Sequence, residues 1–296
     1  MAMKRKITQT IYERGEKAYL VSYDGREITI HRDEIKINND TIKPIDKLYL
    51  ENVVHVPSAI VDKPGMVYDD LYEFYKENIL LSDTNLTLAT AYTWYTWFYD
   101  RVETAPYLYL NGQYGSGKTR LKDLIAHTAF NSTDLGTSVT PANIFRMQNE
   151  IRGTLFIDEF EPDNQNELRV FSQILNGGYK KDAIVFRSEN RRNTQFCPTP
   201  YNVYGPKILC STKLPSLNKA LLSRCFLINM ERVSTSKLKQ HNIALDFSDE
   251  QKANALHIRN RMLRARFDLY EHVPHNHIPG GLLSEFPRDA QLLKSI

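Results

Sequence analysis

The spacing of apolar residues changes character along this chain. From Ile7 to about Ile60, short runs rich in β-branched and aromatic residues alternate with turn residues. The stretch "YLVSYDGREITIHRDEI" predicts a hairpin closed at Asp24-Gly25, a dipeptide that tolerates the positive φ angles of a tight turn. "IKINNDTIKPI" predicts a second hairpin of the same kind. We therefore expect a small β-rich domain over residues 1–62.

A helical pattern replaces the strands between residues 63 and 105. Val67, Leu71 and Phe74 recur at the spacing of one helix face, and an aromatic-rich segment over residues 86–99 predicts a second helix. These two helices would connect the β region to the rest of the chain. The aromatic face of the second helix has two interpretations, a stack for an adenine base or a core element, and the core element is the commoner use of such a face.

From Pro106 onward, apolar runs alternate with amphipathic segments. The segments predict helices after residues 117, 141, 165 and 216. Strands are expected at "YLYLN", "DLGTSV", "GTLFID", "PKILCST" and "CFLINM". This alternation is typical of an α/β fold with a parallel sheet covered on both faces, here over residues 106–236. After Asp249 the strand pattern stops, and a long helix is expected within a helical region over residues 237–296.

The first of these strands leads into "GQYGSGKTR", which fits the phosphate-loop pattern G-x-x-x-x-G-K-[ST]. With ordinary residue frequencies, this pattern arises by chance roughly once in a hundred chains of this length. Glycines let backbone N–H groups turn toward an anion, Lys118 would reach the β and γ phosphates, and Thr119 would offer its hydroxyl to Mg²⁺. The expected nucleotide contacts are Gly112, Gly115, Ser116, Gly117, Lys118, Thr119 and Arg120.

About forty residues later, "GTLFIDEFE" is an apolar strand that ends in Asp158 and Glu159. Asp158 would hold Mg²⁺ through water, and Glu159 would orient and deprotonate an attacking water. A glutamate in this place favours an ATPase over kinase-like proteins, in which a substrate hydroxyl attacks. We place this acidic strand beside the loop strand and expect the strand order 5-1-4-3-2.

Together, these stretches resemble the AAA+ P-loop ATPases of mobile-element, plasmid and phage replication proteins, especially the primase-associated, helicase-like group. The resemblance covers Pro106 to about Arg232, less than half of the chain. It rests on "YLNGQYGSGKTRL", "IFRMQNEIRGTLFIDEFE", "LRVFSQILNGGYKKDAIVFR" and "YGPKILCSTKLPSLNKALLSRCFLINMER". It implies an AAA+-like core with a C-terminal helical lid.

The resemblance also implies roles for three later residues. Thr212 would be the polar sensor that helps to position the lytic water, although most such proteins use Asn there. Arg224 would reach the γ-phosphate held by a neighbouring subunit, and Arg288 would be a second sensor in the lid. The alternatives are hydroxyls that simply end a strand and ordinary surface arginines. The sequence stops eight residues after Arg288, so either the lid is short or the sequence ends within it.

The implied function is Mg²⁺-dependent ATP hydrolysis, ATP and water giving ADP and phosphate, which drives a DNA helicase or helicase-like replication initiator. Such proteins usually act as rings, here expected to be hexamers, on single-stranded or forked DNA. Two alternatives stay open. One is an ATP-controlled switch or assembly protein that acts on a protein partner, and the other is an ATPase of DNA packaging or defence.

Basic residues before the sensor strand are the candidate DNA contacts. "AIVFRSENRRNTQFCP" predicts a hairpin with a charged tip, and such cations supply the salt-sensitive attraction that a grip on phosphates requires. The residues concerned are Lys180, Lys181, Arg187, Arg191 and Arg192. A solvated hairpin or a subunit contact is the alternative. The four arginines of the long helix are expected on a solvated face rather than in a DNA stripe.

The composition gives no support for a membrane role, but it does not identify the binding partner. The 38 basic and 35 acidic side chains leave a formal charge of +3, which permits a nucleic-acid partner but does not argue for one. No apolar run is long enough to cross a bilayer, and the start "MAMKRK" lacks the apolar segment of a signal peptide. The three cysteines form no CxxC pair. We expect reduced thiols in a cytoplasmic protein.

Overall fold

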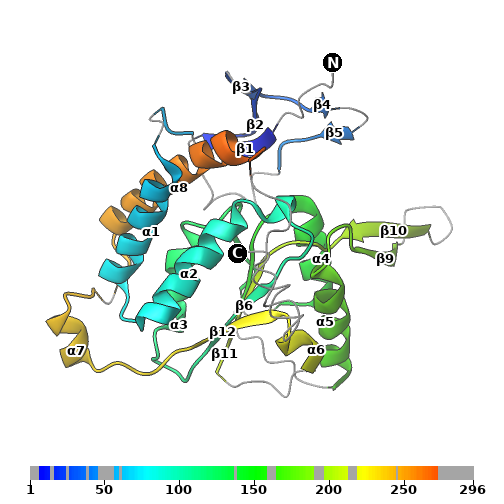
Figure 1. Cartoon of the computed structure of the whole chain (residues 1–296). Helices are drawn as coiled ribbons and strands as arrows, with labels where there is room; N and C mark the ends of the chain where they lie inside the picture. Colours follow the sequence, from blue (N-terminus) through cyan, green and yellow to red (C-terminus); the bar gives the residue numbers. More distant parts are fainter. Residues whose placement is uncertain are drawn as a thin grey trace, which may run out of the picture.

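The structure is a computed structural model of the chain. It describes residues 7–13, 17–24, 27–37, 40–45, 57–59, 62–136, 139–158, 165–189, 197–212, 219–244 and 246–272. These residues build an α/β fold around a five-stranded sheet in which every pairing is parallel (Figure 1). The α/β class and the parallel sheet predicted from the sequence are therefore confirmed.

The sheet strands are β6 (Tyr107–Asn111), β7 (Thr133–Asp134), β8 (Leu155–Ile157), β11 (Lys207–Ser211) and β12 (Cys225–Asn229). They lie side by side as β12-β6-β11-β8-β7, which is 5-1-4-3-2 when they are numbered along the chain. All five residues of β11 are buried, and this strand pairs with both β6 and β8. Placing the acidic strand directly beside the loop strand was therefore wrong. The predicted strand over residues 134–139 is also much shorter in the structure.

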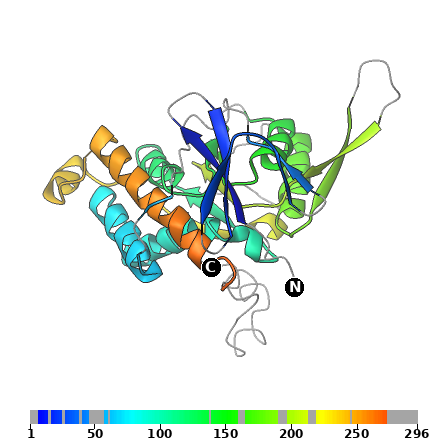
Figure 2. The same cartoon turned by 90° about the horizontal axis from the view of Figure 1, so that it is seen from above.

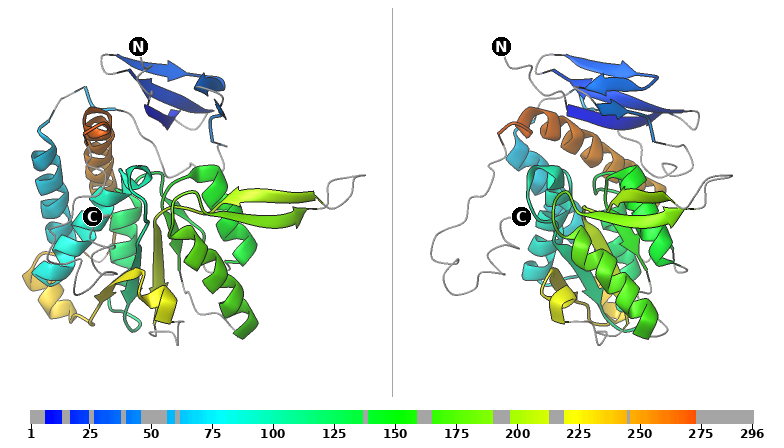
Figure 3. Two further views of the ribbon diagram at one scale, coloured as in Figure 1. Left: turned by 45° about the vertical axis from the view of Figure 1, so that its right-hand side comes forward. Right: turned by 90° about the vertical axis from the view of Figure 1, so that its right-hand side faces the viewer.

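Helices cover both faces of the sheet (Figures 1 and 3). Alternate residues of β6 show the division, since Leu108 and Leu110 join one buried cluster whereas Tyr107 and Tyr109 join the other. The first cluster is covered by α2 (Asp83–Thr96), α3 (Lys118–Ala126), α1 (Pro64–Asn78) and α8 (Asp249–Leu269). The second is covered by α4 (Pro141–Ile151), α5 (Gln165–Gly178) and α6 (Lys219–Leu222).

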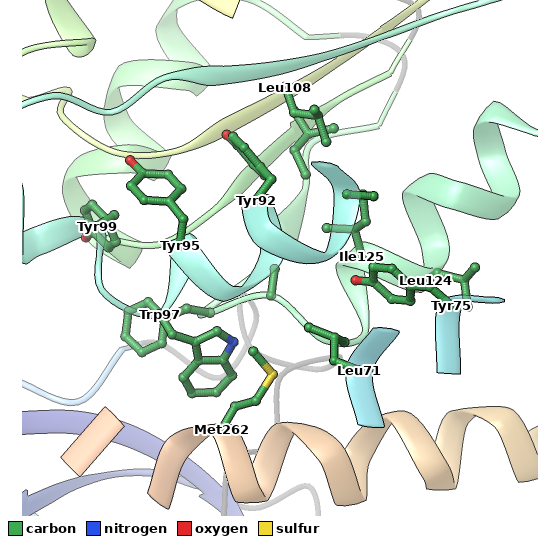
Figure 4. Close-up of a cluster of buried hydrophobic side chains, with 14 of the residues drawn as sticks. Leu71, Tyr75, Tyr92, Tyr95, Trp97, Tyr99, Leu108, Leu124, Ile125 and Met262 are labelled. Carbon is green, nitrogen blue, oxygen red and sulfur yellow. The ribbon is translucent and has the colours of Figure 1, made fainter. Parts of the chain in front are cut away.

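The aromatic face of α2 forms part of this core (Figure 4). Tyr92 is fully buried, and its hydroxyl donates to the carbonyls of Pro106 and Lys207, both at 3.0 Å. Trp97 is also fully buried, and its Nε1 donates to the carbonyl of Thr128 at 2.9 Å. A buried aromatic side chain is stable when its polar atom finds such a partner. The core interpretation of this helix is confirmed, and the adenine stack was wrong for these two residues.

Two antiparallel sheets make up the described part of the N-terminal region. One consists of β1 (Ile7–Glu13), β2 (Lys17–Tyr23) and β3 (Ile28–His31), and the other of β4 (Ile35–Ile37) and β5 (Asp40–Ile42). Both predicted hairpins are confirmed. The larger sheet lies over one end of α8 (Figure 2), where the rings of Tyr23 and Phe267 are 5.5 Å apart.

The arginines of α8 differ from expectation. Arg266 is only 3% exposed and bonds both carboxylate oxygens of Asp100, while Arg259 is 5% exposed and donates to the carbonyl of His127 at 2.9 Å. Arg261 pairs at 2.6 Å with Asp62 and with a second carboxylate on α1. The prediction of a solvated face was wrong for these three arginines, because acceptors from distant segments bind their guanidinium groups.

A hairpin of β9 (Ile184–Glu189) and β10 (Cys197–Asn202) projects from the body of the molecule (Figures 2 and 3). The predicted hairpin is confirmed. Its side chains alternate between the body and solvent, and Ile184 and Phe186 are 53% and 62% exposed. The remaining short helices are η2 (Tyr99–Arg101) and α7 (Thr235–Gln240). Across the described ranges, no helix combines the length and hydropathy needed to cross a membrane.

Lys207, the first residue of β11, is completely buried. Its ammonium donates to the carbonyls of Val203 and Gly205, each at 2.9 Å, and lies 5.2 Å from the centre of the Tyr107 ring. No carboxylate among the described residues forms an ion pair with it. Burial lowers the pKa of Lys207 to about 7.

This burial predicts a specific pH dependence of stability. The pKa of Lys207 in the folded protein lies below the value of about 10.4 in an unfolded chain, so the unfolded state binds more protons between these values. The free energy of unfolding should therefore rise with pH, by up to about 1.4 kcal/mol per pH unit. Lys207→Met should remove that slope in urea unfolding between pH 7.5 and 9.5. The exposed control Lys36→Met should keep that slope. If the free energy of unfolding rises equally with pH in wild type and in Lys207→Met, the prediction is wrong.

Candidate nucleotide-binding site

Three neighbouring parallel strands end at the same edge of the sheet. Ser211 pairs with Asn111 in adjacent strands, and Leu209 pairs with Ile157 on the other side. The chain therefore leaves β6, β11 and β8 at nearly the same level, which is where ligands bind in open α/β sheets. The residues that follow these strands are Gly112, Thr212 and Asp158. The sequence assigned nucleotide chemistry to all three, and the fold brings them together.

The loop after β6 can be built only with glycine at specific positions. At Gly112, a Cβ atom would lie 2.6 Å from the carbonyl oxygen of Met230 and 2.5 Å from Ser116 Oγ. Gly115 and Gly117 have φ angles of +74° and +87°, in the left-handed region that favours glycine. The loop therefore folds back on itself and leads directly into α3, whose N-cap is Gly117.

Ser116 adds an observation that points to a ligand. Its side chain is 6% exposed, and its Oγ has no hydrogen-bond partner among the described residues. A buried hydroxyl without a partner is uncommon and costs stability. The first turn of α3, which follows directly, carries unpaired N–H groups and a partial positive charge. A phosphate oxygen would satisfy both features, so the residues present fit a phosphate group.

Lys118 and Thr119 are the first two residues of α3. The Lys118 ammonium donates to the carbonyls of Gly112 and Gln113, the latter at 3.0 Å, and so lies over the start of the loop. Lys118 and Thr119 both line a cavity of about 380 Å³. Tyr114, at the tip of the loop, is 77% exposed and also lines it.

The rest of the cavity wall comes from segments far apart in the sequence. Asp158 and the end of β11 contribute polar groups, and six apolar residues complete the lining: Ile79, Leu80, Val233, Leu238, Ile243 and Ala244. Ligand sites commonly combine an apolar wall with a few placed polar groups. Sequence reasoning missed these six residues, because none of them belongs to a local motif; Leu238 lies in the short helix α7, and the other five stand in connecting segments.

Arg120 holds the neighbouring elements together as well as lining the cavity. Its guanidinium donates to the carbonyl of Asn78 at 3.2 Å and to the side chain of Gln251 at 3.1 Å, and it lies 5.0 Å from the ring centre of Phe247. Gln251 belongs to the capping box at the start of α8. Arg120 therefore links the phosphate loop to the end of α1 and to α8, a structural role that its sequence position did not predict.

Lys122 lies one helical turn after Lys118 in α3 and is 7% exposed. Its ammonium is 2.7 Å from Asp158 Oδ2 and 2.8 Å from Asp134 Oδ2. Burial lowers the pKa of Lys122, but the hydrogen bonds and charges of the two carboxylates outweigh it, so the net pKa is raised. Sequence reasoning missed Lys122 and Asp134. The only signal was a charged residue among the apolar positions Leu121, Leu124 and Ile125.

Metal-binding chemistry at the site is limited to a few groups. Among the described residues, no cluster of three or more His, Cys, Asp or Glu side chains would hold a metal ion. Mg²⁺ typically uses one or two carboxylates together with substrate phosphates and water, and Thr119 and Asp158 at one cavity fit that pattern. Cys210 also lines the cavity, but burial raises the pKa of its thiol, which disfavours a nucleophilic thiolate.

Thr212 lies at this cavity directly after β11, as the predicted sensor should. Four other predicted site residues fall outside the described residues: Glu159, Arg191, Arg192 and Arg288. Their assigned roles stay predictions.

Arg224 lies away from the loop of its own chain. It directly precedes β12, where Cys225 pairs with Tyr107, while the phosphate loop follows Asn111 at the opposite end of β6. The Arg224 guanidinium donates to the carbonyl of Ala220 and lies 5.4 Å from the ring centre of Tyr179. The fold therefore does not bring Arg224 to the cavity formed by the same chain.

The described candidates for DNA contact lie at and near the base of the β9–β10 hairpin. Lys180 is exposed and its backbone bridges to Thr104, whereas Lys181 is 3.9 Å from a carboxylate oxygen of Glu103. The Arg187 guanidinium lies 5.4 Å from the ring centre of Phe145 on α4.

The sequence matches no family model and no curated protein. Two solved structures of the NrS-1 C-terminal region resemble the fold. The A form apo structure has 11% identity and a TM-score of 0.44, and the apo structure of residues 305–718 has 12% identity and a TM-score of 0.40. Each comparison covers 98% of this chain and 72% of that one. At these scores the likeness assigns no activity to the chain.

Proposed function

We propose that this protein binds ATP with Mg²⁺ and hydrolyses it to ADP and phosphate. The observation that carries the proposal is a cavity at which the loop after β6, its unpartnered Ser116 hydroxyl and Asp158 meet. The loop after β6, the Lys118 ammonium and Thr119 hydroxyl at the start of α3, and the Asp158 carboxylate after β8 all line it. The same cavity offers an apolar wall of the kind that receives a base and ribose.

Each residue has a definite task in this proposal. The loop amides and Lys118 bind the phosphates, and Thr119 and Asp158 hold the metal ion, which supplies charge neutralisation on the phosphate oxygens. Glu159 takes a proton from water as that water adds to the γ-phosphorus and the bond to the β–γ bridging oxygen breaks. Thr212 orients the attacking water. We propose hydrolysis, and not phosphoryl transfer to a substrate hydroxyl, because of Glu159.

Arg224 completes the site from a neighbouring subunit. Its position at the opposite end of β6 and β12 from the phosphate loop supports a contact in trans, since its own cavity is out of reach. An arginine supplied in this way stabilises the charge that develops on the transferred phosphoryl group. The active form would then be a closed ring, which we propose to be a hexamer.

We propose that the protein acts on DNA, as a helicase or helicase-like replication initiator of a mobile element. The β9–β10 hairpin projects from the body (Figure 3), and Arg191 and Arg192 stand in the sequence between its two strands. One observation favours the alternative of an ATP-controlled switch or assembly protein. Ile184 and Phe186 on the same hairpin expose apolar side chains that would suit a protein partner. A DNA-packaging or defence ATPase remains a second alternative.

A shared active site predicts that two inactive variants complement each other. Lys118→Ala lacks a working loop but keeps Arg224, and Arg224→Ala keeps the loop but lacks the arginine, whose loss costs about 10³-fold or more in turnover. In an equal mixture, about a quarter of the interfaces would pair an intact loop with an intact arginine. Phosphate release should therefore reappear on mixing. Normal turnover by Arg224→Ala alone would rule out the shared site.

DNA as the partner predicts a salt-dependent effect of the hairpin tip. Single-stranded DNA should stimulate hydrolysis, and changing both Arg191 and Arg192 to Gln should weaken binding. The slope of log K against log salt should fall by about 1.4, because each phosphate contact on single strands contributes about 0.7. Lys252→Gln, an exposed change on α8, serves as the control. Hydrolysis that is indifferent to single- and double-stranded DNA would instead support the protein-directed alternative.

A further inference from the structure

The ion-paired lysine of α3 occupies an unusual place for a cation. Lys122 belongs to the helix that begins with the phosphate loop, and its neighbours Leu121, Leu124 and Ile125 are completely buried. An apolar side chain would be the ordinary choice on such a face. Burying an ammonium group costs several kcal/mol unless charges compensate for it. Compensation here comes from Asp134 and Asp158, at the ends of two neighbouring strands.

Both carboxylates are held in place around this nitrogen atom. Asp134 Oδ1 accepts a hydrogen bond from the backbone N–H of Gly136 at 2.9 Å, while its Oδ2 accepts from Lys122. Asp158 Oδ2 accepts from the same ammonium. The two carboxylate oxygens can therefore be no further apart than these two short hydrogen bonds laid end to end. Two carboxylates this close repel each other unless a cation lies between them.

A divalent cation favours the same arrangement of oxygens. Mg²⁺ and Mn²⁺ bind carboxylate oxygens, and their affinity rises with the number of negative ligands. Asp134 and Asp158 carry two negative charges, of which Lys122 neutralises one. With the lysine present, the pair is a poor site for a free metal ion. Without it, the same two side chains would form an acidic pair open to any divalent cation.

We propose that Lys122 is a positioning residue for Asp158: its ammonium takes the place of a metal ion between Asp134 and Asp158, so that a divalent cation binds Asp158 only together with a nucleotide triphosphate. The inference rests on the proposed nucleotide site, because it assigns Asp158 to the metal. In this arrangement the triphosphate and Thr119 supply the ligands that outcompete the lysine for Asp158. Metal binding and nucleotide binding thereby become a single event.

Equilibrium dialysis with Mn²⁺ tests this role without measuring turnover. Wild-type protein should retain little Mn²⁺ alone and should retain it when a non-hydrolysable ATP analogue is present. Lys122→Met has a similar length and no charge, and it should bind Mn²⁺ without nucleotide at least about tenfold more tightly than wild type, since the net charge around the site becomes more negative by one. Unchanged nucleotide-independent binding in folded Lys122→Met would overturn the proposal.

Two further variants guard against loss of folding and against general charge effects. Lys122→Gln keeps hydrogen-bond donors for both carboxylates and should also gain nucleotide-independent Mn²⁺ binding. Adding Asp134→Asn to Lys122→Met should abolish the gain, because the pair of carboxylates no longer exists. Lys76→Met, in an exposed pair on α1, should leave Mn²⁺ binding as in wild type. If wild type binds no Mn²⁺ even with the ATP analogue, the proposed function fails, independently of Lys122.

Discussion

The pairing of β11 with both β6 and β8 determines where the residues of the candidate site lie. Because all three strands are parallel and in register, their carboxyl ends emerge together, and the residues that follow them must share one space. No side-chain interaction is needed to bring Gly112, Thr212 and Asp158 near each other. Backbone hydrogen bonds within a sheet buried on both faces achieve it, and they are among the most stable contacts in a protein.

Charged side chains then connect the helices to this sheet edge. Lys122 joins α3 to the ends of β7 and β8, and Arg120 joins the same helix to α1 and α8. The ion pairs of α8 with Asp100 and Asp62 fix that helix against the body. The described elements around the cavity are thus held by a few buried or half-buried cations, each with several acceptors. Removing one partner from such a group costs much more than losing an exposed ion pair.

Sequence patterns predicted local structure and local motifs well, and they failed where distant partners decide. The glycine-dependent loop after β6, the hairpins and the apolar strands follow from neighbouring residues, since glycine spacing and side-chain alternation are local properties. Arg259 and Arg266 show the limit, because their acceptors are supplied by residues more than 100 positions away. The partners of Lys122, Asp134 and Asp158, also lie in other elements, and the apolar wall of the cavity is built from segments far apart in the sequence. The sequence pattern predicted a strand that ends in Asp158, and the structure has that strand as β8, which is only three residues long. It lies beside β11 and not beside β6.

Whether the loop after β6 binds the phosphates of a nucleotide can be measured by calorimetric titration of the protein. ATP and ADP should bind at a single site in the presence of Mg²⁺. AMP should bind about 100-fold more weakly or worse, because it lacks the outer phosphates that the loop amides and Lys118 would hold, and each lost charged hydrogen bond costs about 1.5–3 kcal/mol. Equal affinity for AMP and ATP, or no binding of ATP, would show that this loop does not hold nucleotide phosphates.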